Sequence, residues 1–307
     1  MKPELFIIGG PKCGTTALCT YLAGHPAICF SEPKEPKFFH TDFAGAHRLV
    51  HDEAEYMARF AYDPQRHRML AEGTVWYLYS QTAVSNILAF NPDARFVVMI
   101  RNPVDLAYSL HSQLLYGGDE EVESFEEAWR LQEARKASQQ VPSGARDPKA
   151  LLYGEVAKLG EQVERLLSVV PRERVLVVNH EDFSQNPQRE YRKVLDFAGL
   201  PDDARDSFER VNENRALRRN PLTSILFQLR KVKLALGIRG SFGIWQALQP
   251  LVAKRAQRAG LPEAFADELR EHFKADIERL EHLVELDLTA WKSTASHSPD
   301  KASTDSP

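Results

Sequence analysis

Near its start the chain carries the run Lys12, Cys13, Gly14, Thr15 and Thr16, whose lysine, glycine and threonines are residue types common in phosphate-binding loops. Lysine supplies a cation, glycine lets backbone amides approach an anion, and threonine hydroxyls add hydrogen bonds. An apolar run at residues 5–8 precedes them, and apolar side chains at helical spacing follow Thr15. A strand, a glycine loop and a helix together aim free N–H groups and the helix dipole at an anion. The sequence therefore predicts a phosphate-binding loop.

The spacing of this loop resembles a Walker A loop, with four residues between Gly9 and Gly14. A nucleotide triphosphatase places lysine directly after the second glycine, whereas this chain has Thr15 there and carries its lysine inside the loop as Lys12. The alternative is an ordinary strand, turn and helix. Lysine, glycine and two threonines directly after a strand favour the phosphate loop. We interpret Cys13 as a small filler of that loop, with a reactive thiol as the alternative.

A second candidate anion ligand, Arg101, follows the clearest predicted strand, residues 95–100. Phosphate-binding folds that use magnesium commonly hold the metal with an aspartate at this place. A guanidinium cannot hold a metal ion, but it binds phosphate bidentately. Asn102 and Pro103 have the types expected at the N-cap and first position of a following helix. The sequence thus predicts no metal site, and two anion sites suited to a ligand with two separated phosphate groups.

Both segments resemble motifs of the PAPS-dependent sulfotransferases. The loop PKCGTT is similar to their 5′-phosphosulfate loop, and residues 101–109, RNPVDLAYS, are similar to their 3′-phosphate motif. The resemblance implies that residues 12–16 hold the 5′-phosphate, with Lys12 stabilising the charge on the leaving oxygen. It also implies that Arg101 and Ser109 hold the 3′-phosphate, that PAPS is the donor and that PAP is the product.

The segment KEPKFF, residues 34–39, is similar to the equivalent loop of heparan sulfate-type sulfotransferases and their bacterial relatives. In that branch a glutamate shortly before an aromatic pair is the catalytic base, and Glu35 matches it. Some sulfotransferases use histidine instead, which makes His111 and His40 the alternative bases. The similarity covers most of residues 4–291.

This chain departs from the family pattern at two places. Some heparan sulfate enzymes carry lysine in the stretch equivalent to EGTVWY, where this chain has Gly73. We expect Lys34 or Lys37 to supply that cation. The glycine- and lysine-rich phosphate loop of the family is not obvious either. Arg215 or Arg219 is expected to close over the 3′-phosphate, and solvated surface arginines are the alternative.

Predicted strands alternate with predicted helices along the chain. Buried strands are expected at residues 5–8, 27–30, 69–72, 95–100 and 174–178. Helices are expected at residues 15–23, 43–62 (with solvent-facing histidines), 80–90, 103–115, 125–135, 151–170, 187–198 and 262–291. Continuous apolar strands between helices argue for a parallel sheet covered on both faces. We therefore predict an α/β fold: a P-loop-like central parallel sheet flanked by helices on both faces, with a mainly helical C-terminal part.

Composition and charge fit an ordinary soluble protein, with 43% hydrophobic and 27% charged residues among 307. A net charge of −4 gives no case for nucleic acid as a partner. Three cysteines without metal-ligand spacing argue against a disulfide framework and a zinc site. No stretch is long enough to cross a bilayer and no signal peptide is recognisable. We expect a cytoplasmic, bacterial enzyme.

One domain is expected over residues 1–291, with a disordered tail at residues 292–307. Within the domain, residues 213–262 are basic and amphipathic, because no acidic residue lies between Glu213 and Glu263. Such a segment can cover an active site, bind an acidic glycan or contact an anionic membrane peripherally. A packed helical pair with a solvated basic face is the alternative. We expect an acceptor-side lid here.

Together these features predict a PAPS-dependent sulfotransferase that moves a sulfuryl group in line to a hydroxyl or amine of a small-molecule, lipid or carbohydrate acceptor. One alternative is a P-loop small-molecule kinase, which needs ATP and magnesium. The other is a non-catalytic module that binds PAP or another nucleotide. Thr15 and Arg101 argue against the kinase, and Glu35 argues against the non-catalytic module.

Overall fold

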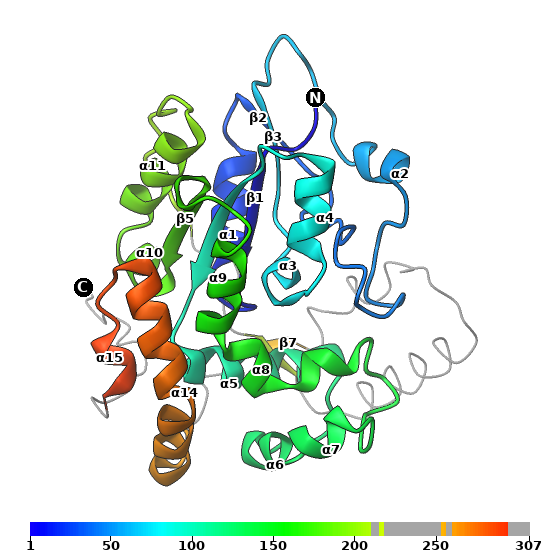
Figure 1. Cartoon of the computed structure of the whole chain (residues 1–307), viewed down its shortest axis with the longest axis vertical. Helices are drawn as coiled ribbons and strands as arrows, with labels where there is room; N and C mark the ends of the chain where they lie inside the picture. Colours follow the sequence, from blue (N-terminus) through cyan, green and yellow to red (C-terminus); the bar gives the residue numbers. More distant parts are fainter. Residues whose placement is uncertain (210–214, 218–252, 256–259, 294–307) are drawn as a thin grey trace.

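Five parallel strands form the central sheet, in the order β2-β3-β1-β4-β5 (Figure 1). The structure is a computed structural model that describes residues 1–209, 215–217, 253–255 and 260–293. The strands are β1 (Leu5–Gly9), β2 (Ile28–Phe30), β3 (Met69–Glu72), β4 (Arg95–Ile100) and β5 (Val175–Asn179). Each overlaps a strand predicted from the sequence, and the predicted α/β fold is confirmed.

Helices surround this sheet and make up most of the described C-terminal part (Figure 1). Before β5 they are α1 (Thr15–Ala23), α2 (Glu53–Met57), α3 (Trp76–Tyr79), α4 (Ala83–Phe90), α5 (Pro103–Gly117), α6 (Phe125–Arg130), α7 (Gln132–Lys136), α8 (Tyr153–Ala157) and α9 (Leu159–Leu167). After β5 they include α10 (His180–Gln185), α11 (Pro187–Ala198), α14 (Glu263–Val284) and α15 (Thr289–Lys292). Of the helices that the structure describes, none is both long and apolar enough to cross a membrane.

The direction of each crossover decides which face of the sheet its helix covers. From β1 the chain moves to β2 at one edge, whereas from β3 to β4 and from β4 to β5 it moves the other way. Because such crossovers are right-handed, α1 lies on one face, and α3, α4 and α9 lie on the other. The ring of Tyr21 in α1 contacts Phe183 of α10 and Tyr191 of α11, so these helices share the face of α1.

The expected helix at residues 43–62 is wrong for most of its length, since only α2 is helical there. Asp52 caps α2 by accepting a hydrogen bond from Glu55 N. The preceding chain folds back instead, and His47, which we expected to face solvent, is buried against His40. A tertiary contact of this kind overrides the local helical preference.

The expected long helix at residues 151–170 is also interrupted, at Lys158, between α8 and α9. Helix α14 crosses α9 so closely at this point that a Cβ at Gly160 would collide with Asp276. Asp276 accepts hydrogen bonds from Gly160 N at 2.8 Å and from Glu161 N at 2.9 Å. A side chain from α14 therefore satisfies the amides that begin α9, a role that local capping residues usually have.

A short antiparallel pair, β6 (Arg215–Leu217) and β7 (Ala253–Arg255), is separate from the main sheet, and β6 contacts α5. The rest of the basic 213–262 segment up to residue 259, and the predicted tail from residue 294, lie outside the described residues. The tail and the single-domain boundary therefore stay predictions.

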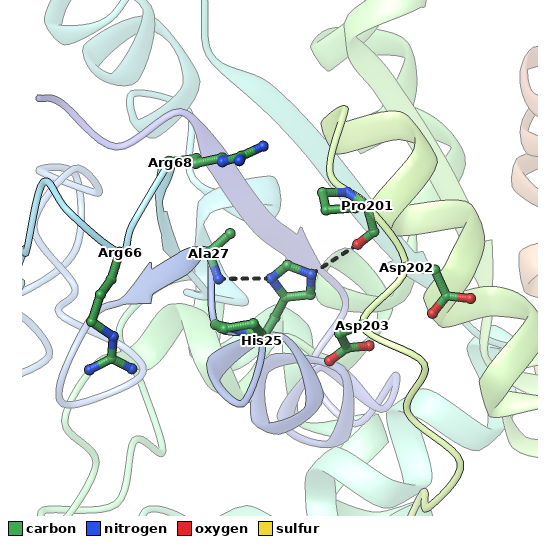
Figure 2. A pocket seen from close by; sticks show the side chains of 8 residues that line it. His25, Ala27, Arg66, Arg68, Pro201, Asp202 and Asp203 are labelled. Carbon is green, nitrogen blue, oxygen red and sulfur yellow. Dashed lines mark hydrogen bonds between the residues drawn. The ribbon is translucent and has the colours of Figure 1, made fainter.

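A pocket of about 350 Å³ lies at the amino-terminal edge of the sheet, beside the starts of β2 and β3 (Figure 2). Its lining includes His25, Arg66, Arg68, Asp202 and Asp203. The Nδ1 atom of His25 accepts from Ala27 N at 3.1 Å, and its Nε2 lies 3.0 Å from the carbonyl oxygen of Pro201. The Nδ1 bond thus braces the α1–β2 turn, and the Nε2 contact ties that turn to the chain after α11. This pocket is on the opposite edge from the predicted phosphate loop.

The capping of α9 by Asp276 generates a stability prediction. Replacing Asp276 by alanine leaves two amides of α9 without acceptors, so we expect the free energy of unfolding to fall by about 1–3 kcal/mol. Chemical denaturation monitored by circular dichroism measures the change. The Glu278→Ala variant, an exposed acid on the same helix, is the matched control and should stay within about 0.5 kcal/mol of the parent. Equal losses for the two variants would contradict the capping role.

Candidate functional site

The loop between β1 and α1 has the backbone of an anion-binding cradle. Gly9 has a φ of 139°, and a Cβ there would collide with the backbone of Met99 in β4. Lys12 and Gly14 have left-handed φ values of 68° and 86°, which turn the chain so that α1 begins at Thr15. The amides of the first helical turn have no partners within the helix, and the helix dipole favours an anion there.

Arg101 reaches this loop from the end of β4. Its Nη1 donates to the backbone oxygen of Lys12 at 3.0 Å. The two groups meet because the parallel register pairs Gly9 with Met99, which brings the ends of β1 and β4 side by side. Asn102 then caps α5 by accepting from Val104 N at 3.0 Å, as predicted. The two predicted anion-binding groups therefore share one edge of the sheet.

Two buried polar atoms at this corner have no hydrogen-bond partner within the described residues: Arg101 Nε and Glu181 Oε2. Glu181 follows β5 through His180. Burial raises its pKa, and the charge of Arg101 offsets part of the rise. An unsatisfied buried donor costs about 1–3 kcal/mol, and an anionic oxygen would satisfy the guanidinium. The unsatisfied Nε of Arg101 thus fits a phosphate oxygen, whereas Glu181 Oε2 is an acceptor and cannot donate to one.

Lys34, just after β2, also reaches the loop. Its Nζ donates to Thr15 Oγ1 at 3.2 Å and to Thr16 Oγ1 at 3.3 Å. The same ammonium lies 3.4 Å from Glu35 Oε1. The segment KEPKFF and the phosphate loop, apart in the sequence, therefore meet at one lysine. Sequence reasoning offered Lys34 as a substitute cation, but it did not foresee the contact with both threonines.

Glu35 lies between two ammonium groups. Lys34 is on one side, and Lys37 Nζ is 3.7 Å from Glu35 Oε2 on the other. Burial lowers the pKa of Lys37, although the neighbouring Glu35 opposes the shift. Arg146 adds positive charge beside Lys37 and is itself bound bidentately by Asp119. The side chain of Glu35 is 27% exposed, which leaves it accessible to a substrate.

The backbone after Glu35 is held by a buried tyrosine that sequence reasoning did not single out. Tyr77 Oη accepts from Phe38 N at 2.9 Å and from Phe39 N at 3.2 Å. The carboxyl group of Glu72, at the end of β3, is a charged neighbour of Tyr77 and accepts hydrogen bonds from Tyr56 Oη at 3.1 Å and from Thr74 Oγ1 at 3.2 Å. Burial raises the pKa of Glu72 to about 8, although hydrogen bonds from its neighbours oppose the shift. The run EGTVWY thus positions KEPKFF.

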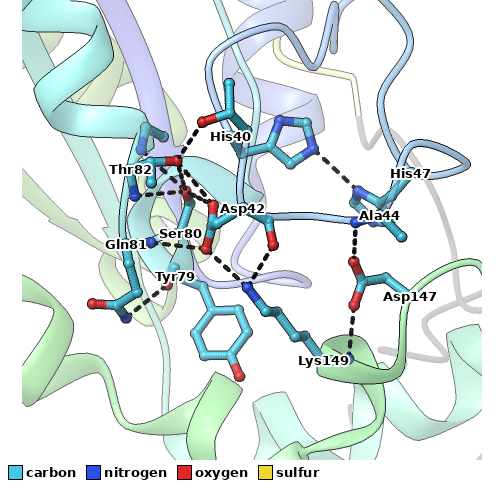
Figure 3. A network of polar contacts seen from close by, with 12 residues as sticks. His40, Asp42, Ala44, His47, Tyr79, Ser80, Gln81, Thr82, Asp147 and Lys149 are labelled. Atoms are coloured by element: carbon cyan, nitrogen blue, oxygen red, sulfur yellow. Dashed lines mark hydrogen bonds and ion pairs between the residues drawn. The ribbon is translucent and has the colours of Figure 1, made fainter.

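A polar network anchors the chain that follows Phe39 (Figure 3). Asp42 accepts from Ser80 Oγ at 2.5 Å, from Thr82 Oγ1 at 3.1 Å and from Lys149 Nζ at 3.0 Å. Although burial alone would raise the pKa of Asp42, hydrogen bonds from Ser80 and Lys149 lower it to about 2. Asp147 extends the network by accepting from Ala44 N at 2.6 Å. The chain that follows Glu35 is therefore held at two places, by Tyr77 and by the network around Asp42.

The sequence matches the family described as "Sulfotransferase domain" over residues 2–259. The chain belongs to the sulfotransferase family. The resemblance carried by the phosphate loop and by RNPVDLAYS is thus confirmed at the level of the family.

Similar proteins include several heparan sulfate sulfotransferases. Human bifunctional heparan sulfate N-deacetylase/N-sulfotransferase 2 is 25% identical over 201 residues, which are 64% of this chain and 22% of that protein. Mouse heparan sulfate glucosamine 3-O-sulfotransferase 3B1 is 29% identical over 201 residues, 64% of this chain and 46% of that protein. This sulfotransferase chain therefore spans less than half the length of these curated relatives.

A solved structure supports the fold. The crystal structure of a sulfotransferase from Alicyclobacillus acidocaldarius has a TM-score of 0.69 and 26% sequence identity to this chain. It covers 95% of this chain, and the match covers 100% of that one. The parallel sheet with its surrounding helices is thus the fold of a sulfotransferase.

The alternative bases of this sulfotransferase are both buried. His111 is 2% exposed, and its Nε2 lies 2.9 Å from the backbone oxygen of Val122. His40 is fully buried beside His47, and burial lowers its pKa to about 3. These surroundings suit structural histidines. The geometry favours Glu35 as the base, and the roles of all three residues stay predictions.

Three further predicted ligands have described positions. Cys13 is fully buried, and burial raises the pKa of its thiol far above the ordinary value, which agrees with a small filler. Ser109 is 1% exposed on α5, the helix that follows Arg101. Arg215 begins β6, which contacts the same helix. Arg219 lies outside the described residues. Their contacts with a phosphate stay predictions.

The bonds of Tyr77 generate a test of how the sulfotransferase positions Glu35. Replacing Tyr77 by phenylalanine removes the acceptor of two loop amides and lets the loop shift. A displacement of about 1 Å costs up to roughly 100-fold in rate. We expect PAPS consumption to slow by about 10- to 100-fold while affinity for PAP, measured by calorimetry, stays unchanged. The exposed Tyr62→Phe variant is the control, and equal rates in the two variants would refute the positioning role.

Proposed function

We propose that this sulfotransferase binds PAPS and transfers its sulfuryl group in line to a hydroxyl or amine of an acceptor, releasing PAP. The contact between Arg101 and the phosphate loop carries the proposal, because it puts two anion-binding groups from different strands at one edge of the sheet. A ligand with one terminal phosphate needs the loop alone. A 3′,5′-bisphosphorylated nucleotide uses both groups.

The residues of the loop have distinct roles in this proposal. The 5′-phosphate is held by the amides of Gly14, Thr15 and Thr16 and by the two threonine hydroxyls. Cys13 belongs to the same loop and fills its buried side. Lys12 stabilises negative charge on the leaving oxygen, the kind of electrostatic contribution that is large in group transfer. Outside the loop, Arg101 binds the 3′-phosphate, with Ser109, Arg215 and Arg219 as further candidates.

Glu35 is the proposed general base, with His111 as the alternative. PAPS supplies a sulfuryl group on a leaving phosphate oxygen. The acceptor oxygen or nitrogen forms a bond to sulfur, and its proton moves to the Glu35 carboxylate. The bond from sulfur to the bridging oxygen breaks, and its electron pair stays on the 5′-phosphate. Positioning and charge stabilisation carry most of the rate in the related phosphoryl transfer.

The kinase alternative requires a metal ion bridging phosphates, and Arg101 stands where such folds use an aspartate. Repulsion between a guanidinium and a divalent cation argues against that site. A non-catalytic nucleotide-binding module would have no use for a partly exposed carboxylate held beside the phosphate loop by Lys34. We therefore propose metal-independent transfer.

The acceptor is proposed to be a small molecule, a lipid or a carbohydrate. The names of the heparan sulfate relatives favour a carbohydrate. The basic 213–262 segment is proposed to cover the acceptor and to allow peripheral contact with an anionic membrane. The three cysteines are free and buried, which suits the reducing cytoplasm that we propose as the compartment.

Ligand preference tests the function directly. We expect calorimetry in EDTA to give tighter binding for PAP than for adenosine 5′-phosphate or ATP. The Arg101→Ala variant should lose about 10- to 150-fold in PAP affinity, because a charge-assisted hydrogen bond is worth roughly 1.5–3 kcal/mol. Its affinity for adenosine 5′-phosphate should change only a few-fold. Arg66→Ala, an exposed arginine at the opposite edge (Figure 2), is the control. Preference for ATP with magnesium would favour the kinase.

Loss of the base provides the kinetic test. We expect Glu35→Gln to slow PAPS consumption by about 10²–10⁴-fold, the usual contribution of a general base, with unchanged PAP affinity. A screen of sugars, phenols, lipids and amines supplies the acceptor. Glu32→Gln, an exposed acid on the same loop, is the matched control. Retained turnover in Glu35→Gln together with loss in His111→Asn would reassign the base to the histidine.

A further inference from the structure

We propose that Lys34 is a second catalytic cation, placed to bind the sulfuryl group while it passes from donor to acceptor. The inference rests on the proposed function. Its first support is position: Lys34 Nζ lies 3.2 Å and 3.3 Å from the hydroxyls of Thr15 and Thr16, and 3.4 Å from Glu35 Oε1. One ammonium therefore touches both the proposed donor cradle and the proposed base.

The lengths of these contacts favour a further ligand. An ammonium has three N–H donors, and those of Lys34 have partners at distances near or beyond the long end of ordinary N–H···O bonds. Two of the partners are neutral hydroxyls. A negatively charged sulfuryl oxygen makes a shorter and stronger hydrogen bond to an ammonium than a hydroxyl does. A group that sits between the loop and Glu35 would therefore replace weak contacts with a strong one.

The backbone holds Lys34 in this place. The carbonyl oxygen of Lys34 accepts from Ser31 Oγ at 3.1 Å and from Gly73 N at 3.3 Å. The side chain then passes over Gly73. A Cβ at that position would lie 3.3 Å from Lys34 Cε and would collide with Cys19 Sγ. Glycine at the end of β3 thus leaves the room through which the stem of Lys34 reaches the loop.

Lys37 lies on the other side of Glu35 and does not compete for this role. It approaches the second carboxylate oxygen, Oε2, at 3.7 Å. Its charged neighbours are Arg146 and Asp119 rather than the phosphate loop. Of the two lysines that sequence reasoning left open, the geometry assigns Lys34 to the transferred group.

In the transfer step Lys34 stabilises charge on the non-bridging sulfuryl oxygens, while Lys12 stabilises charge on the leaving oxygen. Neither lysine gains or loses a proton. The acceptor proton still moves to Glu35, and the electron pair of the broken bond still stays on the phosphate. Lys34 therefore acts on the transition state, and it contributes less to the binding of PAP, which has no sulfuryl group.

The Lys34→Met variant tests this role, because methionine keeps much of the stem and removes the charge. The first readout is release of sulfate from PAPS without acceptor, and the second is PAP affinity by calorimetry. We expect sulfate release to fall by about 10²–10³-fold, the usual loss when one oxyanion ligand is removed. PAP affinity should fall less than about tenfold. Equal losses in both would make Lys34 a ground-state phosphate ligand, and unchanged release would overturn the proposal.

Moving the cation gives a second test that a merely structural role would fail. The triple variant Cys19→Ala, Lys34→Ala, Gly73→Lys removes the ammonium of Lys34 and supplies another from position 73. The two alanines make room for the new side chain, because a Cβ at position 73 would meet Cys19 Sγ and Lys34 Cε. The matched control carries Gly73→Met with the same two alanines. We expect the lysine variant to release sulfate at least about tenfold faster than the methionine variant. Equal rates in the two folded variants would refute a cation role at this point.

The outcomes separate this inference from the proposed function. A parent protein that neither binds PAP nor consumes PAPS would overturn the function and the inference together. A parent protein that consumes PAPS as fast as Lys34→Met does would overturn the inference alone. Lys37→Met, which removes the other charge beside Glu35, should retain more sulfate release than Lys34→Met does. The reverse order would assign the sulfuryl group to Lys37.

Discussion

The close approach of β1 to β4 is the constraint on which the site depends. A side chain at Gly9 would collide with the backbone of Met99, and Gly10 N donates to the oxygen of Met99 at 3.1 Å. The two strands therefore end side by side, and the turns that follow them are fused. The bond from Arg101 to the carbonyl of Lys12 is a consequence of that fusion. A bulkier residue at position 9 would separate the two anion-binding groups, however well each turn formed by itself.

Local rules found most of the sheet and the phosphate loop. Strands of consecutive apolar residues, a glycine turn and the Asn102 cap are signals within a few residues of one another, so one sequence is enough to recognise them. The predicted helix at residues 43–62 was wrong because the chain there is set by a tertiary contact, that of His40 with His47. The single long helix predicted at residues 151–170 was wrong because the break between α8 and α9 depends on Asp276 of α14, more than a hundred residues away. Where the partner is distant, periodicity predicts a longer helix than the chain forms.

The candidate site divides in the same way. Lys12, Thr15 and Arg101 follow directly from motifs, and Glu35 from the segment that resembles a family loop. Glu72 and Tyr77 were missed as site residues, because a buried glutamate at a strand end and a tyrosine in a short helix carry no local sign of function. Their role becomes visible only when Tyr77 is seen to accept from two amides of the loop that carries Glu35. Positioning residues are found through their partners, and the partners are distant in sequence.

The charge of the site is spread over the strand ends rather than concentrated in one loop. Lys12 follows β1, Lys34 follows β2 and Arg101 follows β4. Because parallel strands end at the same edge, three cations reach one region without neighbouring each other in sequence, where their repulsion would oppose folding. A Walker-type loop instead gathers lysine and a metal ion at a single helix start. With Thr15 in the lysine position, the positive charge in this fold comes from the neighbouring strands, which requires their register to be as strictly set as the loop itself.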